Sequence, residues 1–279
     1  MKRVLVTGSG GYIGRHVVSK LLDMGHQVIA CDICNDGVDD RAEKREISIF
    51  EAGPGLYEEL GRPDVCIHLA WRNGFVHNAD THMGDLSGHF HFIKNLLDAG
   101  LKNIAIMGSM HEVGYFEGAI KEDSPCNPLS QYGIAKNALR QSIMQMVEGT
   151  DVNLYWLRAY YILGDDTRNH SIFTKIIEMD AKGEELFPFT SGKNKYDFIT
   201  VDLLAEYIAL ASTQTQVTGI INVCTGQPKS LGDRVEEFIK ERNLSIRLNY
   251  GAFPDREYDS PGVWGDVSKI NEIIEASKE

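Results

Sequence analysis

The stretch at residues 4–14 reads V-L-V-T-G-S-G-G-Y-I-G, and it decides the fold of this 279-residue chain. Three apolar residues predict a strand that ends at Thr7. The glycines at positions 8, 11 and 14 permit a tight turn and a close approach of the backbone to a pyrophosphate. The helix that follows points its N-terminus, with a partial positive charge, at the same place. We therefore predict a phosphate-binding turn of the dinucleotide-binding type.

Asp32 supports this interpretation, because it ends the next apolar run, Val28–Asp32. An acidic residue at that strand end is placed to bind the ribose hydroxyls of adenosine, and it repels a 2′-phosphate. The sequence therefore favours NAD over NADP as the dinucleotide. Arg15 and Arg41 leave NADP as the alternative.

Short apolar runs alternate with helical patterns through the first half of the chain. Strands are expected at Val4–Val6, Val28–Asp32, Val65–Leu69, Ile104–Met107 and Val152–Arg158, with helices at 12–24, 80–99 and 129–148. This alternation predicts an α/β fold with a Rossmann-type, doubly wound parallel sheet.

The order of elements is looser in the second half. Helices are expected at 169–182, 201–212, 230–242 and 267–277, and short strands at 220–223 and 245–250. We predict an NAD-binding Rossmann domain at 1–165 and a smaller C-terminal substrate-binding lobe at 166–279. The two are interleaved, because 196–226 is expected to pack back on the first domain.

Composition limits the classes of partner. The formal net charge of −12 repels nucleic acid and anionic lipid, so no nucleic-acid or membrane partner is expected. No run approaches the roughly 18 apolar residues of a membrane span, and the N-terminus lacks a signal peptide. Five scattered cysteines favour free thiols in a reducing compartment, so a cytoplasmic protein is expected.

Two further motifs follow the glycine turn along the chain. H-L-A-W at 68–71 follows a predicted strand, and Y-G-I-A-K at 132–136 lies on a predicted helix. With the spacing T-G-x-x-G-x-x-G, the chain resembles the extended short-chain dehydrogenase/reductase family of nucleotide-sugar epimerases, dehydratases and ketoreductases. The resemblance implies an NAD site formed by Gly8, Gly11, Tyr12, Ile13, Gly14, Asp32, Leu69, Ala70, Trp71, Tyr132 and Lys136.

Tyr132 and Lys136 are four residues apart, so on a helix they share a face. The resemblance implies that they are the catalytic Tyr-x-x-x-Lys pair. A nearby ammonium and the nicotinamide charge would lower the pKa of the phenol, which could then exchange a proton with a substrate hydroxyl. Lys136 would also hold the nicotinamide ribose.

The chain departs from the family at the end of the strand near 104–107. There the family carries S-[ST]-x-x-V-Y-G, and counting back from Val113 places Met110 where a catalytic Ser or Thr is expected. A thioether donates no hydrogen bond. Three explanations stay open: Ser109 is reoriented, His111 or a water substitutes, or Tyr132 acts alone. Loss of activity is the fourth.

Glu112 raises a further alternative, since related 4,6-dehydratases have T-D-E where this chain has Met110-His111-Glu112. His111 could then act as the acid and Glu112 as the base. In epimerases a glutamate at this position is often structural. For the substrate, the resemblance implies contacts from Tyr161 and Arg256.

The resemblance implies hydride transfer at C4 of a nucleotide-activated hexose, and a 4-epimerase is the first expectation. A nucleotide-4-keto-6-deoxyhexose 4-reductase and then a dehydratase are the alternatives, and a catalytically silent NAD-binding regulator is the alternative of another class. The family also implies a homodimer formed through helices 80–99 and 129–148.

Two patterns resemble metal sites only superficially. Cys31 and Cys34 form a lone C-x-x-C, which lacks the second half of a zinc site. The histidines at 77, 82, 89 and 91 lack the carboxylate spacing that would complete a ligand set. We expect no metal, and we expect these histidines on helix surfaces and loops.

Overall fold

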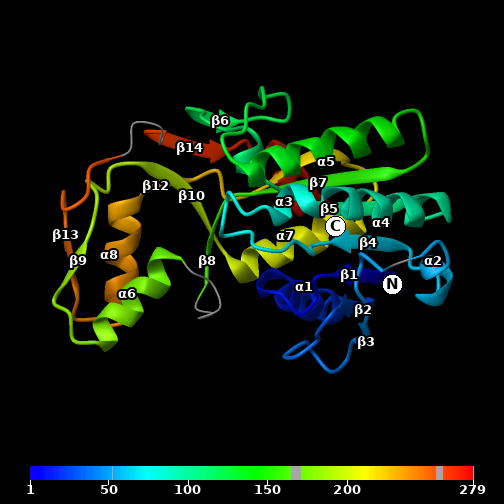
Figure 1. The fold of residues 1–279 in the computed structure, drawn as a ribbon, viewed down its shortest axis with the longest axis horizontal. Coiled ribbons are helices and arrows are strands. Elements are labelled where there is room, and N and C mark those ends of the chain that lie inside the picture. Colours follow the sequence, from blue (N-terminus) through cyan, green and yellow to red (C-terminus); the bar gives the residue numbers. More distant parts are fainter. Residues whose placement is uncertain (52, 165–170, 256–259, 279) are drawn as a thin grey trace.

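The computed structural model describes residues 1–51, 53–164, 171–255 and 260–278, and its centre is a seven-stranded parallel sheet (Figure 1). The strand order is β11-β7-β5-β4-β1-β2-β3. The strands are β1 (Arg3–Thr7), β2 (Gln27–Asp32), β3 (Glu43–Glu46), β4 (Val65–His68), β5 (Asn103–Ser109), β7 (Asn153–Ala159) and β11 (Gly219–Val223). This confirms the predicted Rossmann-type fold.

Helices cover both faces of the sheet, because successive strand residues point to opposite sides. Val4 and Val6 face one core with α1 (Tyr12–Asp23), α7 (Val201–Thr213) and α9 (Ser268–Ala276). Leu5 faces the other core with α2 (Leu56–Glu59), α4 (Leu86–Asp98) and α5 (Gln131–Val147). Figure 1 shows α1 and α7 on one face, with α4 and α5 on the other.

A smaller lobe lies at one end of this sheet (Figure 1). It begins with a second sheet, β12-β10-β14-β6, in which β8 also pairs with β10: β6 (Gly118–Ile120), β8 (Tyr161–Leu163), β10 (Lys195–Thr200), β12 (Pro228–Ser230) and β14 (Gly262–Gly265). Beyond it, a separate apolar core is enclosed by α6 (Ile172–Ala181), α8 (Leu231–Glu241), β9 (Leu186–Pro188) and β13 (Arg247–Asn249).

The strand order reverses between β1 and β4, so the chain leaves these two neighbouring strands toward opposite faces. In an open parallel sheet a ligand binds in the crevice that such a reversal creates at the carboxyl ends of the strands. The glycine turn after β1 and the H-L-A-W segment after β4 therefore lie on the two sides of one crevice.

Several elements differ from the expectations. The helix predicted at 80–99 is divided into α3 (Thr81–Gly84) and α4, and at the junction Asp85 accepts hydrogen bonds from Arg72. Strand β3 was not predicted, because its sequence E-K-R-E has no apolar alternation. Helix α9 packs on α7 and β11 in the first lobe, although the prediction placed it in the second.

Two expectations concern the chain as a whole. All five cysteines are free thiols, as expected. Within the described ranges, no helix has both the length and the apolar character to cross a lipid bilayer.

Candidate active site

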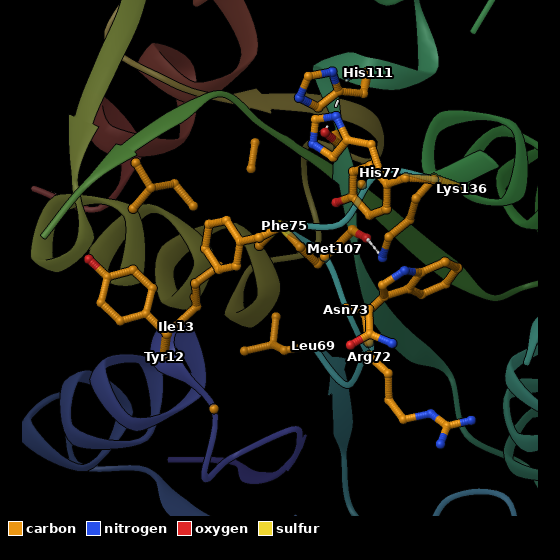
Figure 2. A pocket seen from close by; sticks show the side chains of 18 of the residues that line it. Tyr12, Ile13, Leu69, Arg72, Asn73, Phe75, His77, Met107, His111 and Lys136 are labelled. Carbon is orange, nitrogen blue, oxygen red and sulfur yellow. Dashed lines mark hydrogen bonds between the residues drawn. The ribbon is translucent and has the colours of Figure 1, made fainter. Parts of the chain in front are cut away.

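A cleft of about 1700 Å³ runs between the two lobes. Its floor is formed by the glycine turn and by the carboxyl ends of β2, β4 and β5, while β8, α6, β10 and β14 contribute the far side. Figure 2 shows side chains of the first lobe projecting into it, from α1 and from the segments after β4 and β5. Most residues predicted for the cofactor and for catalysis line this single cleft, so the structure brings them together.

The glycine turn forms a cradle that side chains would fill. Gly8 has φ +70°, and a Cβ added there would lie 2.6 Å from the backbone nitrogen of Ala70. A Cβ on Gly14 would lie 2.0 Å from the carbonyl oxygen of Gly8. Helix α1 starts at Tyr12 with Gly11 as its N-cap, so no side chain covers its first amides. This cradle fits the pyrophosphate of a dinucleotide.

Asp32 lies at the end of β2, beside the same cradle. Its carboxylate accepts hydrogen bonds from the amides of Gly10, at 3.0 Å, and Ile33, at 2.7 Å, and it lines the cleft. Arg41, which could have favoured a 2′-phosphate, is paired with Asp39 and Asp23. The arrangement fits NAD, as predicted.

The H-L-A-W segment contributes the indole of Trp71 to the cleft. The ring of Trp71 lies 3.7 Å from the Nζ of Lys136 and stacks on His89 at 4.4 Å. Its Nε1 donates to Nδ1 of His82 at 3.0 Å. The partly buried indole contacts several of the imidazoles around it, so Trp71 links the cleft to α3 and α4.

The expectation that these histidines lie on surfaces is therefore wrong for two of them. His82 and His89 are each 1% exposed. His82 donates from Nε2 to the carbonyl of Val76, and His89 Nδ1 is hydrogen-bonded to His68 Nε2 at 3.0 Å. Periodicity placed His89 on a helix flank, but it could not show that Trp71 packs over that flank. His91 is exposed, as expected.

Tyr132 and Lys136 share one face of α5 at the centre of the cleft. Lys136 Nζ donates to the carbonyl of Met107 at 2.7 Å, shown as a dashed line in Figure 2. Burial lowers the pKa of Lys136 to about 7, although the charge of Glu112 opposes this shift. The ammonium is thus held between a carbonyl and the face of Trp71.

The phenol of Tyr132 has its pKa raised to about 12, chiefly by burial. A hydrogen bond with the side chain of Ser109 opposes this shift, while the charge of Glu112 adds to it. Lys136, which was expected to lower this pKa, is not among the groups that shift it. The positive charge of a bound nicotinamide would act in the opposite direction.

Ser109, next to Met110, carries the hydroxyl that Met110 lacks. Its hydroxyl is the group that contacts Tyr132, and it also accepts from the amide of His111 as the N-cap of the short 3-10 helix η1 (Met110–Glu112). Ser109 therefore brings a hydroxyl to Tyr132 from one position earlier than counting indicated. Met110 lines the cleft but is 7% exposed and packs among apolar residues.

Glu112 does not line the cleft. Its fully buried carboxyl group accepts from Trp156 Nε1, at 2.9 and 3.0 Å, and from the amide of Ser109, at 2.6 Å. Arg158 and Arg140 lie 3.6 and 3.7 Å away. Burial raises the pKa of Glu112, and Arg158 opposes the shift. Glu112 is placed to orient Ser109, and it cannot reach a sugar from this position.

His77 is a cleft residue that sequence reasoning did not assign to the site. Its ring stacks on Tyr132, with centroids 5.6 Å apart and planes 12° apart, and it meets His111 at 4.4 Å. Its carbonyl accepts from the amide of Tyr132 at 2.8 Å. Burial lowers the pKa of His111 to about 4, so its imidazole is uncharged at neutral pH. Only the unusual density of histidines near 77–91 could have suggested that His77 belongs to the site.

The second lobe contributes mostly aromatic and aliphatic side chains to the cleft. Tyr161 lines it as predicted and packs against Tyr196 with ring centroids 4.3 Å apart. The predicted diphosphate contact, Arg256, lies outside the described residues. In the described part of the chain, no group of three or more His, Cys, Asp or Glu side chains is arranged to hold a metal ion.

Comparison with known proteins agrees with this geometry. Residues 4–224 match the model of the NAD dependent epimerase/dehydratase family. A dTDP-6-deoxy-L-talose 4-dehydrogenase (NAD(+)) of Aggregatibacter actinomycetemcomitans is 44% identical over 94% of this chain and 98% of its own. UDP-arabinose 4-epimerase 1 of Arabidopsis thaliana is 26% identical over 97% of this chain and 74% of its own.

Solved structures share the fold. A UDP-glucose-4-epimerase from Stenotrophomonas maltophila, with bound NAD and formylated UDP-arabinopyranose, superposes with a TM-score of 0.86 at 19% identity, covering 99% of this chain and 93% of that one. The UDP-glucose 4-epimerase of Thermotoga maritima gives 0.81 at 22% identity, covering 97% and 91%. With the glycine cradle, Asp32 and the Tyr132–Lys136 pair in one cleft, the chain belongs to the NAD-dependent epimerase/dehydratase family of enzymes.

Proposed function

We propose that the protein is an NAD-dependent 4-dehydrogenase of a dTDP-6-deoxyhexose, interconverting the 4-hydroxy sugar and its 4-keto form. The observation that carries the proposal is the group formed by Tyr132, Ser109 and Lys136 in a cleft that fits a dinucleotide. The substrate class is supported by the 44% identity with a dTDP-6-deoxy-L-talose 4-dehydrogenase over nearly the full chain. This favours the 4-keto sugar reductase and dehydrogenase reaction over the 4-epimerase that was expected first.

The residues around C4 supply the proton chemistry. In the oxidative direction Tyr132 takes the proton of the C4 hydroxyl as the C4 hydrogen leaves with its electron pair, and Ser109 holds the same oxygen. Bound NAD supplies the acceptor of that hydride. Lys136, whose pKa burial lowers to about 7, is placed to stabilise the phenolate form of Tyr132 that accepts this proton and to hold the nicotinamide ribose. In the reductive direction Tyr132 returns the proton.

Dehydration and a silent regulatory role both lose support from the geometry. Dehydration needs a base at the sugar, but the carboxyl group of Glu112 is engaged by Trp156 and Ser109 beneath the cleft. A silent regulator would not need the partly buried Tyr132 and the buried Lys136 in one cleft. Burying these polar groups costs free energy, and their shifted pKa values are typical of catalytic groups.

The direct test is to incubate the purified protein with NAD and dTDP-6-deoxy-L-talose, following NADH absorbance and product mass. A 4-dehydrogenase forms NADH and a product two hydrogens lighter. A 4-epimerase gives an isomer of unchanged mass without net NADH, and that result would replace the proposal. Tyr132→Phe should lower the rate by about 10²–10⁴, while its circular dichroism and NAD binding stay near those of the wild type.

We also propose that the enzyme is a homodimer formed through α4 and α5. A shallow apolar groove on these helices and α3 supports it, lined by Met83, Leu86, Ser87, Phe90, Leu139 and Ser142. Met83 is 46% exposed there. Light scattering should give twice the chain mass of 31.2 kDa, and Met83→Lys should give the monomer mass. A wild-type monomer at micromolar concentration would exclude the dimer.

A further inference from the structure

The cleft beside Tyr132 is lined by two kinds of side chain. His77 and His111 present imidazoles near the phenol, and Figure 2 shows both rings close together beside Lys136. The neighbouring surface is apolar, and we call it the apolar wall: Met110, Phe116, Tyr160 and Val263, all of which line the cleft and belong to one packed cluster. A sugar ring whose O4 contacts Tyr132 therefore meets surfaces of different polarity.

Met110 is where this wall begins. It follows Ser109, whose hydroxyl contacts Tyr132, so its side chain lies within one residue of the group that holds the reacting oxygen. It packs toward the second lobe, with Tyr160 and Val263. In the proposed function the hydroxyl of Ser109 holds the reacting oxygen of the sugar. Residue 110 is therefore not needed for this contact, and it contributes a thioether to the cleft.

The polar atoms of the wall are already engaged. The hydroxyl of Tyr160 donates to Asn222 Oδ1 at 3.1 Å. The hydroxyl of Ser260, which borders the wall, donates to the carbonyl of Phe116 at 2.5 Å. A sugar hydroxyl placed against the described residues of this wall would lose its hydrogen bonds to water. The hydroxyls of Tyr160 and Ser260 could not replace them, because both already donate within the protein, so this placement is unfavourable.

In a hexose, C5 is bonded to C4, so the C6 substituent lies within a few ångströms of the reacting oxygen. A methyl group at C6 gains free energy against an apolar surface, and a hydroxymethyl group leaves its oxygen unpaired there. The imidazoles of His77 and His111 suit the C3 hydroxyl on the other side of C4.

We propose that Met110, with the apolar wall, is a specificity-determining residue that selects a C6 methyl group over a C6 hydroxymethyl group. This inference rests on the proposed 4-dehydrogenase function and explains why that site accepts 6-deoxy sugars. Apolar pockets reject an added hydroxyl only moderately, by about 10². We therefore expect the wild type to prefer the 6-deoxy sugar by roughly 10- to 100-fold in kcat/KM.

The test uses a pair of substrates that differ by one oxygen atom, dTDP-6-deoxy-L-talose and dTDP-L-talose. The ratio of their kcat/KM values is measured for the wild type, Met110→Thr and Met110→Leu with NAD. Thr presents a hydroxyl that can pair with a C6 hydroxyl, so Met110→Thr should lower the ratio about tenfold. Leu is apolar and of similar volume, so Met110→Leu should keep the ratio within about threefold of the wild type.

A binding measurement separates this inference from the proposed function. The Kd of each sugar is measured by calorimetry with the NADH-loaded enzyme, which cannot oxidise it. If no variant turns over either sugar, the 4-dehydrogenase proposal fails, and the Kd ratios still decide the role of Met110. A ratio that falls only in Met110→Thr supports the inference. Equal ratios in all three proteins, or a wild type without preference, overturn it.

Discussion

The glycine turn after β1 and the surroundings of Tyr132 line the same cleft, yet one is made of backbone and the other of buried side chains. At the turn, Gly8 and Gly14 leave room that any Cβ would fill. Around Tyr132, Lys136 is 3% exposed and Glu112 is fully buried. The glycine turn has room for a ligand because its residues have no side chains. The region around Tyr132 contains ionisable groups whose burial costs free energy.

This difference predicts opposite responses to mutation. A backbone cradle adds little cost to folding, so filling it should harm cofactor binding above all. Buried ionisable groups at an active site lower the stability of the fold. Replacing one with an apolar residue should therefore lower the activity and raise the free energy of unfolding. Substitutions on each side can therefore show whether the two regions differ as the structure indicates.

Gly14→Ala tests the glycine side and carries the larger expected effect. Its Cβ would lie 2.0 Å from the Gly8 carbonyl oxygen, so the turn must move. Strain of this kind is on the order of 1–3 kcal/mol, and we expect the Kd for NAD to rise about 10- to 100-fold. Displacement of bound NADH by NAD, followed by the NADH fluorescence, measures it.

The matched control is Gly53→Ala, since a Cβ there would meet nothing within 4 Å. Its NAD affinity should equal that of the wild type. If Gly14→Ala also binds NAD as tightly as the wild type, the turn is not the pyrophosphate cradle. The proposed difference between the glycine turn and the surroundings of Tyr132 is then wrong for the turn.

The same difference explains what the sequence could reveal. The glycine turn, Asp32 and the Tyr132–Lys136 pair were predictable, because fixed spacings along one strand, turn or helix determine where these residues lie. The parallel sheet followed from apolar runs of the right length. The structure confirms the parallel sheet, and the family match confirms the predicted family.

The remaining features depend on contacts between distant segments. The buried state of His82 and His89 follows from Trp71, and the apolar wall joins Met110 to β14 across the two lobes. Strands β6, β8 and β14 have only three or four residues, too few for an alternation to be recognised. Counting within the motif could not show that the hydroxyl of Ser109, rather than position 110, meets Tyr132.

Lys136→Met tests the catalytic side and carries the smaller expected effect, measured as stability. Folding lowers the pKa of Lys136 from 10.5 to about 7, chiefly through burial. Between these values the unfolded chain binds more protons than the folded one, so the free energy of unfolding contributed by this group rises with pH. The penalty is full below about pH 7 and disappears as pH approaches 10.5. Met removes it, so the variant should be more stable at pH 7.

Urea unfolding of the protein without cofactor at pH 7, 8 and 9 measures this difference. Titration of the buried thiols, such as Cys31 with its pKa raised to about 12 by burial, affects wild type and variant alike. The stability gained by Lys136→Met should therefore be largest at pH 7 and shrink steadily toward pH 9. Lys182→Met, at an exposed position after α6, should show no such trend. A pH-independent difference for Lys136→Met would mean that the buried ammonium is fully compensated by Met107 and Trp71, and that catalysis imposes no cost on folding here.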